Sequence, residues 1–217
     1  MDYAVDIVLA IDCTGSMASA IGYAKNHALE FHDQLMKAMD AKQKGISQLR
    51  VKVISFRDYY NDPPEMAMAE STFFTLPQES DKLSEFVNNL HASGGGPEPE
   101  CSLEAIALAI QSDWETGHDK SRQIIVLWTD ASAHSLEKEG KPATYPSVPD
   151  SFADLSSTWG QGLAATSKRL ILFAPALDPW PTVAEHWDNV IHFESSAGQG
   201  LGDVDYNVIL NSIANSV

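Results

Sequence analysis

Cysteines and long hydrophobic runs are scarce in this sequence. Its 217 residues include only two cysteines, Cys13 and Cys101, and no Cys-x-x-Cys pair. This scarcity excludes a disulfide framework and the usual Cys-x-x-Cys zinc and redox motifs, so we expect a cytoplasmic protein. No apolar run approaches the ~20 residues that a membrane-spanning helix needs. Residues 1–6 are acidic and carry no basic segment, so we expect no signal peptide there.

Basic residues are also in short supply. The chain has 14 lysines and arginines against 30 aspartates and glutamates, which gives a formal net charge of −16. Nucleic-acid phosphates and anionic membranes repel such a chain, so we expect neither as a partner. The acidity has two interpretations. It serves solubility, or it gathers carboxylates that attract a metal ion or a basic protein.

Familiar ligand-binding motifs are missing as well. No Gly-x-Gly-x-x-Gly follows the first apolar run, and no Gly-x-x-x-x-Gly-Lys-[Ser/Thr] occurs. These absences argue against a dinucleotide-binding fingerprint and a phosphate-binding P-loop. Seven histidines are scattered without a His-x-x-x-His pair. Among them, His134 is expected to be a solvated loop residue.

The pattern that is present alternates strands with helices. We predict strands at residues 4–11, 49–56, 67–76, 123–129, 169–174 and 190–193. We predict helices at residues 16–42, 80–90, 100–111, 151–167, 183–187 and 205–216. Gly45 is expected to cap the first and longest helix. The long loop at residues 134–149 is expected to be functional or mobile.

This alternation predicts an α/β fold with a doubly wound, mostly parallel central sheet and helices on both faces. The segment 67–76 is expected to add one antiparallel edge strand next to the second strand. We expect a single domain over residues 1–217, whether it is a whole protein or part of one. In such folds, ligands bind at the carboxyl ends of the strands.

The first candidate site follows the first strand, in the loop Asp12-Cys13-Thr14-Gly15-Ser16. One carboxylate and two hydroxyls stand two residues apart, and Gly15 permits a tight turn between them. These are hard oxygen ligands, which suit Mg²⁺, Mn²⁺ or Ca²⁺ better than zinc. The alternative is that Ser16 only caps the following helix.

Two further loops are expected at the same edge of the sheet. The loop at residues 94–100 reads Gly-Gly-Gly-Pro-Glu-Pro-Glu, and its last residue, Glu100, is either a ligand or a first-turn helix charge. Asp130 directly follows the most apolar strand, where a metal ion is a suitable partner for its charge. The alternative for Asp130 is that it caps a loop.

These motifs resemble those of von Willebrand factor A domains. Asp12-x-Thr14-x-Ser16 is similar to the Asp-x-Ser-x-Ser loop of that family's metal-ion-dependent adhesion site, and Asp130 matches the later aspartate of the site. The resemblance implies that Asp12, Thr14, Ser16 and Asp130 are metal ligands.

The chain departs from the family at the glycine-rich loop. Glu100 stands where the family usually has a threonine, so it is a candidate fifth ligand. The Pro-Glu-containing loop, the segment 56–58 and the loop 145–159 look like the subgroup found in α-kinases and intracellular bacterial proteins.

The resemblance implies a non-enzymatic, metal-dependent protein-interaction module. A partner's Asp, Glu or other oxygen ligand would complete the coordination of the metal. The alternatives are a phosphohydrolase-like enzyme of the HAD type and a scaffold whose site is empty. Thr14 argues against an enzyme of the HAD type, because such an enzyme needs a second aspartate at that position. The oligomeric state stays open.

Two neighbouring features accompany these loops. Arg57 and Asp58 follow the second strand, and we expect them to form an ion pair behind the site. The alternative is a surface ion pair of little energetic value. Cys13 and Cys101 flank proposed ligands, so oxidation of the two thiols is a further hypothesis, beside ordinary buried thiols.

Overall fold

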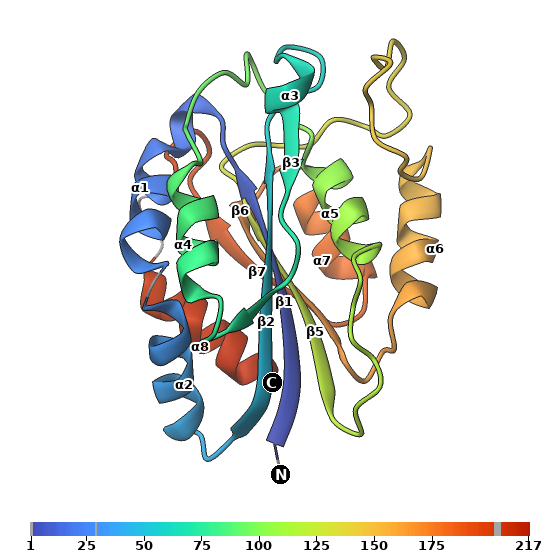
Figure 1. The fold of residues 1–217 in the computed structure, drawn as a ribbon. Helices are drawn as coiled ribbons and strands as arrows, with labels where there is room; N and C mark the ends of the chain where they lie inside the picture. Colours follow the sequence, from blue (N-terminus) through green and yellow to red (C-terminus); the bar gives the residue numbers. More distant parts are fainter. Residues whose placement is uncertain (1, 29, 202–204) are drawn as a thin grey trace.

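A seven-stranded sheet forms the centre of the molecule (Figure 1). The computed structural model describes residues 2–28, 30–201 and 205–217. The strands are β1 (Asp2–Asp12), β2 (Gly45–Phe56), β3 (Met68–Glu70), β4 (Phe74–Leu76), β5 (Ser121–Trp128), β6 (Lys168–Pro175) and β7 (Val190–Ser195). Their order is β3-β2-β1-β5-β6-β7, with β4 also paired to β2. The strands β1, β2, β5, β6 and β7 run parallel, which confirms the predicted fold class.

Helices cover both faces of this sheet. On one face lie α1 (Ala18–His27), α2 (Phe31–Asp40), α4 (Ser80–Asn88) and α8 (Tyr206–Ser216). On the other lie α5 (Ser102–Ile110), α6 (Phe152–Gly162) and α7 (Trp180–His186). The short α3 (Pro64–Ala67) lies in a loop at the carboxyl end of the sheet (Figure 1).

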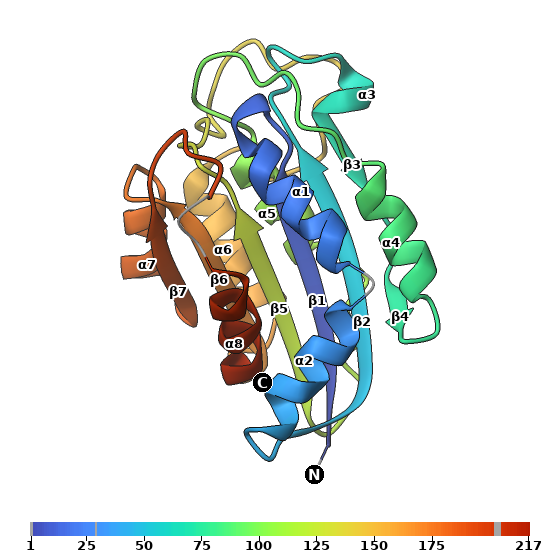
Figure 2. The ribbon, with the colours of Figure 1, turned by 90° about the vertical axis from the view of Figure 1, so that its left-hand side faces the viewer.

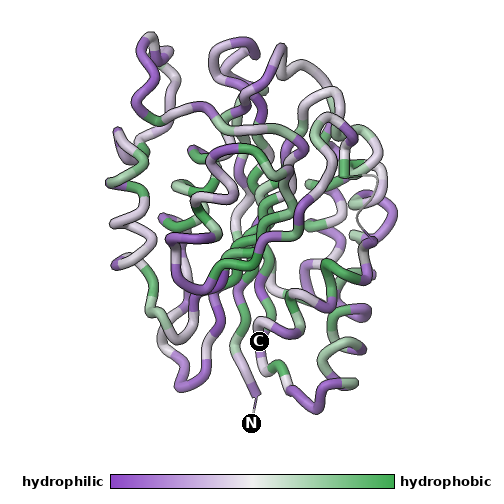
Figure 3. Tube along the Cα trace, turned by 180° about the vertical axis from the view of Figure 1, so that it is seen from behind, coloured by the Kyte–Doolittle hydropathy of each residue, from purple (hydrophilic) through white to green (hydrophobic). Residues whose placement is uncertain are grey.

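The alternation of side chains along β1 explains this two-sided arrangement. Ile7 and Ile11 pack into the hydrophobic cluster under α1, α2 and α8, whereas Val8 and Ala10 pack into the cluster under α5 and α6. Hydrophobic residues gather in the central strands, and the loops at the ends of the sheet are mostly hydrophilic (Figure 3). Of the helices in the described ranges, none is both long and apolar enough to cross a membrane.

The predicted single helix at residues 16–42 is wrong. The chain forms a short 3₁₀ turn, η1 (Gly15–Met17), and then α1 and α2 as separate helices. Figure 2 shows α1 and α2 following one another across the sheet, with α4 on one side and α8 on the other. Both helices bury apolar residues on the sheet side, so the apolar spacing continues through the break and hides it. The predicted cap at Gly45 is also wrong, because α2 ends at Asp40 and Gly45 begins β2.

The predicted edge strand is split. Instead of one strand at residues 67–76, β3 and β4 each pair antiparallel with β2. Between them, a side chain pairs with β2 in place of the backbone. The Oγ of Ser71 accepts a hydrogen bond of 2.9 Å from the Val53 amide. The helix predicted at residues 100–111 begins only at Ser102. Glu100 therefore precedes the helix, and it forms an isolated parallel bridge with Ala133.

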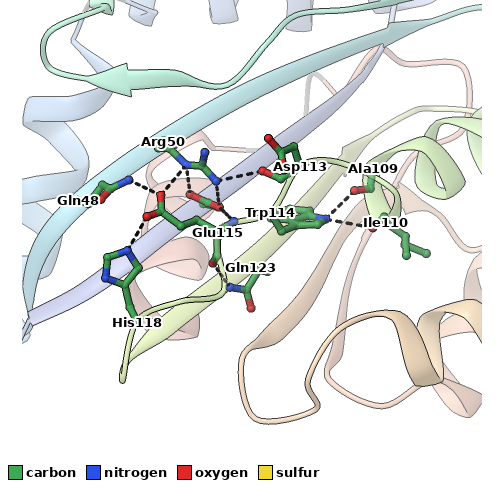
Figure 4. A network of polar contacts seen from close by, with 10 residues as sticks. Gln48, Arg50, Ala109, Ile110, Asp113, Trp114, Glu115, His118 and Gln123 are labelled. Carbon is green, nitrogen blue, oxygen red and sulfur yellow. Dashed lines mark hydrogen bonds and ion pairs between the residues drawn. The ribbon is translucent and has the colours of Figure 1, made fainter.

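A partly buried ion pair joins the strands at the opposite end of the sheet (Figure 4). Arg50 of β2 donates from Nε to Asp6 Oδ1 of β1 at 2.8 Å. The Glu115 amide donates to the other oxygen of Asp6 at 2.8 Å. The network thus ties β1 and β2 to the connection between α5 and β5, far along the strands from the carboxyl ends.

Candidate metal centre

The carboxyl ends of β1 and β5 lie side by side and begin the candidate site. Ile11 is in register with Trp128, so Asp12 and Thr129 are neighbours across the two parallel strands. The loop after β1 carries Thr14 and Ser16, and Asp130 follows Thr129. The topology therefore brings two of the three candidate loops together at the centre of the sheet.

Asp12 is fully buried and its two oxygens are held by the adjoining loops. The Thr14 amide donates to Oδ1 at 2.8 Å, and the Thr129 hydroxyl donates to Oδ2 at 2.7 Å. Burial raises the pKa of Asp12 to about 6, although the hydrogen bonds from Thr14 and Thr129 oppose that rise. This carboxylate is therefore fixed in position and costly to keep charged without a nearby cation.

Ser16 connects the first loop to Asp130. Its hydroxyl donates to Asp130 Oδ1 at 2.9 Å, and Ser16 Oγ lies 3.5 Å from Thr14 Oγ1. No side-chain hydrogen bond caps η1 or α1, so the helix-capping alternative for Ser16 is wrong. The Gly200 amide donates to Asp130 Oδ2 at 2.7 Å. The side chain of Asp130 is thus engaged by both the first loop and the segment after β7.

Glu100 enters the same site from the glycine-rich loop and is 3% exposed. Its amide donates to Ser132 O at 3.0 Å, and its carbonyl accepts from the His134 amide at 2.8 Å. Its Oε2 is buried and has no hydrogen-bond partner among the residues that the structure describes. Burial raises the pKa of Glu100 to about 9, and the charges of Asp12, Asp58, Asp62 and Asp130 add to the rise. The group therefore needs a positively charged neighbour to stay ionised at neutral pH.

The glycines let the second loop close on the first. Gly95 has a φ of +92°, and a Cβ there would lie 2.5 Å from Thr14 Cγ2 and 2.7 Å from Glu100 Oε1. The Gly15 amide donates to Gly94 O at 3.3 Å. Only a glycine at position 95 combines this backbone conformation with so close an approach.

A cavity of about 230 Å³ opens where these loops meet. It is lined by Thr14, Ser16, Glu100 and Asp130, together with Gly15, Gly94, Gly96, Glu98, Ala131 and Gly198. The lining thus includes two hydroxyl residues and three acidic ones, Glu98, Glu100 and Asp130, with the carboxylate of Asp12 behind them. These hard oxygen donors fit a divalent cation such as Mg²⁺.

The prediction that Arg57 and Asp58 form an ion pair with each other is wrong. Arg57 Nε donates to the carbonyls of Cys13 at 3.0 Å and Ser93 at 2.9 Å. The buried guanidinium therefore holds the first loop against the segment that leads into the glycine-rich loop. Asp58 lies instead 3.2 Å from Nε2 of His134. His134, expected to be solvated, is 5% exposed.

Both cysteines are free thiols in the interior. Cys13 packs in the cluster under α1, and burial raises its pKa to about 12. Burial also raises the pKa of Cys101 well above its ordinary range. Protonated thiols react slowly with oxidants. These environments therefore favour the interpretation that Cys13 and Cys101 are ordinary buried thiols over the hypothesis that they are oxidised.

Two parts of this site are not predicted by the sequence. Thr129 stands next to Asp130 in the chain, but its hydrogen bond to Asp12 depends on the order of the strands in the sheet. The segment around Gly200 contacts Asp130 from a distant part of the chain, and its sequence carries no ligand-like signal.

Comparisons with known proteins agree with this architecture. The family model of the von Willebrand factor A domain matches residues 6–143. The alpha-protein kinase vwkA of Dictyostelium discoideum is 23% identical over 142 residues, which is 65% of this chain and 21% of that protein. The chain thus spans about a fifth of the length of that relative.

Solved structures show the same fold. Two structures of the pilus adhesin SpaC from Lactobacillus rhamnosus GG match with TM-scores of 0.59 and 0.56, at 10% and 11% sequence identity. Each match covers 98% of this chain and 30% of the adhesin chain. At such low identity the likeness concerns the fold alone. Since the family model covers more than half of the sequence, the chain belongs to the von Willebrand factor A domain family.

Proposed function

We propose that this domain binds a hard divalent cation at the carboxyl ends of β1 and β5 and uses it to bind a protein partner. Mg²⁺ is the proposed ion, with Mn²⁺ or Ca²⁺ as substitutes. The proposed ligands are Asp12, Thr14, Ser16, Glu100 and Asp130. A partner's Asp, Glu or other oxygen ligand fills the remaining coordination position.

The unpartnered Oε2 of Glu100 is the observation that carries this proposal. A buried carboxylate oxygen without a hydrogen bond is destabilising, since desolvation is not repaid. Two more buried carboxylates, Asp12 and Asp130, act on the same group and raise its pKa further. A divalent cation stabilises all three at once, which also argues against a scaffold with an empty site.

The cavity in front of these residues supports a role in partner binding. Thr14 and Ser16 line it, and its volume of about 230 Å³ is several times that of a single water molecule. Completing the coordination of an ion in a partly dry cleft is more favourable than the same contact in water. The glycines of the surrounding loops supply little contact surface, so the ion itself is the centre of recognition.

Glu100 also sets the charge that a partner meets. Three ionised carboxylates around one divalent cation leave a net charge of −1, where the usual threonine would leave zero. This excess negative charge weakens the attraction for a partner carboxylate. Neutral oxygen donors and carboxylates flanked by basic residues are therefore the preferred partner groups.

Thr14 argues against an enzyme of the HAD type. Such an enzyme needs a second aspartate two residues after the nucleophile, to protonate the leaving group. Thr14 stands at that position after Asp12, and its hydroxyl is a poor general acid. We therefore propose a non-enzymatic binding module.

Calorimetric titration of the full chain with Mg²⁺ and Mn²⁺ tests the metal site. Wild-type protein is expected to bind one ion, and Glu100→Gln is expected to lower the affinity at least about tenfold. Glu139→Gln is the control, because it removes the same charge from an exposed position in the loop after β5 that does not line the cavity. Equal affinities in wild type and Glu100→Gln, or equal losses in both variants, would contradict the proposal.

A further inference from the structure

Behind Glu100 lies a second cluster of ligand-type side chains. Asp58, Cys101 and His134 are all buried, and one potential ligand atom from each lies within 4.8 Å of the others. They come from three separate segments: the loop after β2, the start of α5, and the loop after β5. The proposed ligands of the cation in the first site do not include any of them.

Two of the distances within this cluster are close to those around a tetrahedral ion. Asp58 Oδ1 lies 3.2 Å from His134 Nε2 and 3.6 Å from Cys101 Sγ. With ordinary zinc–nitrogen, zinc–oxygen and zinc–sulfur bonds, neighbouring ligand atoms of a tetrahedral site are ~3.4 to ~3.6 Å apart. An ion would therefore fit among the three atoms after small movements of the side chains.

A fourth buried group borders the cluster. Glu104 is completely buried one helical turn after Cys101, close enough for its charge to raise the pKa of the Cys101 thiol. Its Oε1 accepts from the Tyr145 hydroxyl, while its Oε2 lacks a partner within the described ranges. This orphaned oxygen adds an uncompensated acidic group beside the cluster, which a cation would stabilise.

We propose that Asp58, Cys101 and His134, with Glu104 beside them, form a second metal site that takes a zinc-class ion. A sulfur and an imidazole ligand suit Zn²⁺ or Co²⁺, whereas Mg²⁺ prefers an all-oxygen set. Binding displaces the thiol proton of Cys101 to solvent and leaves a metal–thiolate bond. No electron transfer is involved, because the ion does not change its oxidation state.

The site would hold the loop that carries Glu100. Cys101 is the next residue in the chain, and the His134 amide donates to the Glu100 carbonyl at 2.8 Å. An ion shared by Cys101 and His134 therefore fixes the backbone on both sides of Glu100. The role is structural, and it does not depend on whether the oxygen site binds Mg²⁺.

One contact must change when the ion binds. Lys138 Nζ lies 3.1 Å from Nδ1 and 3.4 Å from Nε2 of His134, and it can donate to Nδ1 only when that nitrogen carries no proton. If Nε2 coordinates a metal, Nδ1 carries the proton, and Lys138 has to turn away. The same ammonium already lies 3.7 Å from the ring centre of Tyr60, where it can remain. Lys138 therefore opposes metal binding, which provides a diagnostic substitution.

Cobalt spectroscopy tests the proposal on the full chain. Metal-free protein is titrated with Co²⁺ while excess Mg²⁺ is present. A thiolate-to-cobalt charge-transfer band in the near ultraviolet is expected at one equivalent, and Zn²⁺ is expected to remove it. Cys101→Ser should abolish the band, and Cys13→Ser is the matched control that should keep it. Absence of the band in wild type, or its loss in Cys13→Ser alone, would overturn the proposal.

Three further variants guard against misfolding and against confusion with the first site. Lys138→Met is expected to raise Co²⁺ affinity severalfold, whereas it leaves affinity unchanged if the cluster is only a hydrogen-bond chain. Glu104→Gln is expected to weaken Co²⁺ binding about tenfold. Glu100→Gln should keep the band, so failure of the Mg²⁺ site and failure of this site give different results.

Discussion

The hydroxyl of Thr129 donates a hydrogen bond of 2.7 Å to Asp12 Oδ2, across the carboxyl ends of β1 and β5. The same hydroxyl accepts from the Ala131 amide at 3.2 Å. One side chain thus orients the carboxylate of the first loop and shapes the turn that presents Asp130. Both effects act on the proposed metal site from behind.

Thr129→Val is expected to lower Mg²⁺ affinity by about 10–100-fold, because Asp12 loses the group that orients it. The valine keeps the shape of the side chain but leaves Asp12 Oδ2 and the Ala131 amide without their partner. Thr129→Ser keeps the hydroxyl and is expected to bind Mg²⁺ within a few fold of wild type. Calorimetry on both variants checks this. Equal weakening by valine and serine would show that the hydroxyl is not responsible.

Mg²⁺ affinity is expected to rise with pH. Burial and neighbouring carboxylates raise the pKa of Glu100 to about 9, and that of Asp12 to about 6. Between these values, Glu100 is protonated in the metal-free protein, so the ion must displace one proton. Affinity should therefore increase by about tenfold per pH unit in this window and level off above it. Calorimetry in buffers of different ionisation enthalpy measures the released proton.

Glu100→Gln removes the titrating group and is the control for this pH dependence. Its weaker Mg²⁺ binding should vary little between pH 6 and pH 9. A wild-type affinity that stays constant over the same range would contradict the assignment of Glu100 as a ligand.

Gly95→Ala is expected to weaken Mg²⁺ binding at least about tenfold. The added Cβ would meet Thr14 and Glu100 at distances shorter than van der Waals contact, and the residue has a positive φ. Gly140→Ala is the matched control, because Gly140 also has a positive φ, of +78°, but has open space around it. Both variants carry about 1 kcal/mol of backbone strain. Only Gly95→Ala should lose metal affinity, and equal affinities would place the glycine loop outside the site.

The Asp6–Arg50 pair is expected to stabilise the fold without affecting the site. The Asp6 and Arg50 side chains are 4% and 16% exposed. Asp6→Asn leaves Arg50 only its longer ion pair with Glu115 Oε2, at 3.4 Å, and is expected to cost about 2 kcal/mol in the free energy of unfolding. Urea unfolding of both single variants and of Asp6→Asn/Arg50→Met measures the coupling. Additive losses, or a change in Mg²⁺ affinity, would contradict this separation of stability from function.

The sequence predicted much of the site because its residues follow strand ends. Asp12, Thr14 and Ser16 stand in one short loop, and the rule for parallel sheets brings Asp130 beside them. Glu100 was predicted from its place in a glycine-rich loop, and the structure places it in the same cavity. Which of these residues coordinate an ion remains a prediction.

Other features depend on contacts that periodicity does not encode. The break between α1 and α2 preserves the apolar spacing, so a continuous helix was the simplest prediction. His134 was predicted to be solvated because it lies in a loop, yet that loop folds back so that the histidine meets Asp58 at 3.2 Å. These two residues are far apart in sequence, and only the arrangement of the loops brings them together.

Water-proton relaxation of the Mn²⁺-loaded domain tests the central claim most directly, since it reports both a bound ion and an open coordination position. Wild-type protein is expected to enhance the relaxation rate on binding Mn²⁺, because water occupies the open position. A short peptide with a carboxylate flanked by basic residues should then reduce the enhancement by displacing that water. Asp12→Ala should show neither effect. No enhancement in wild type, or an equal enhancement in Asp12→Ala, would contradict the account.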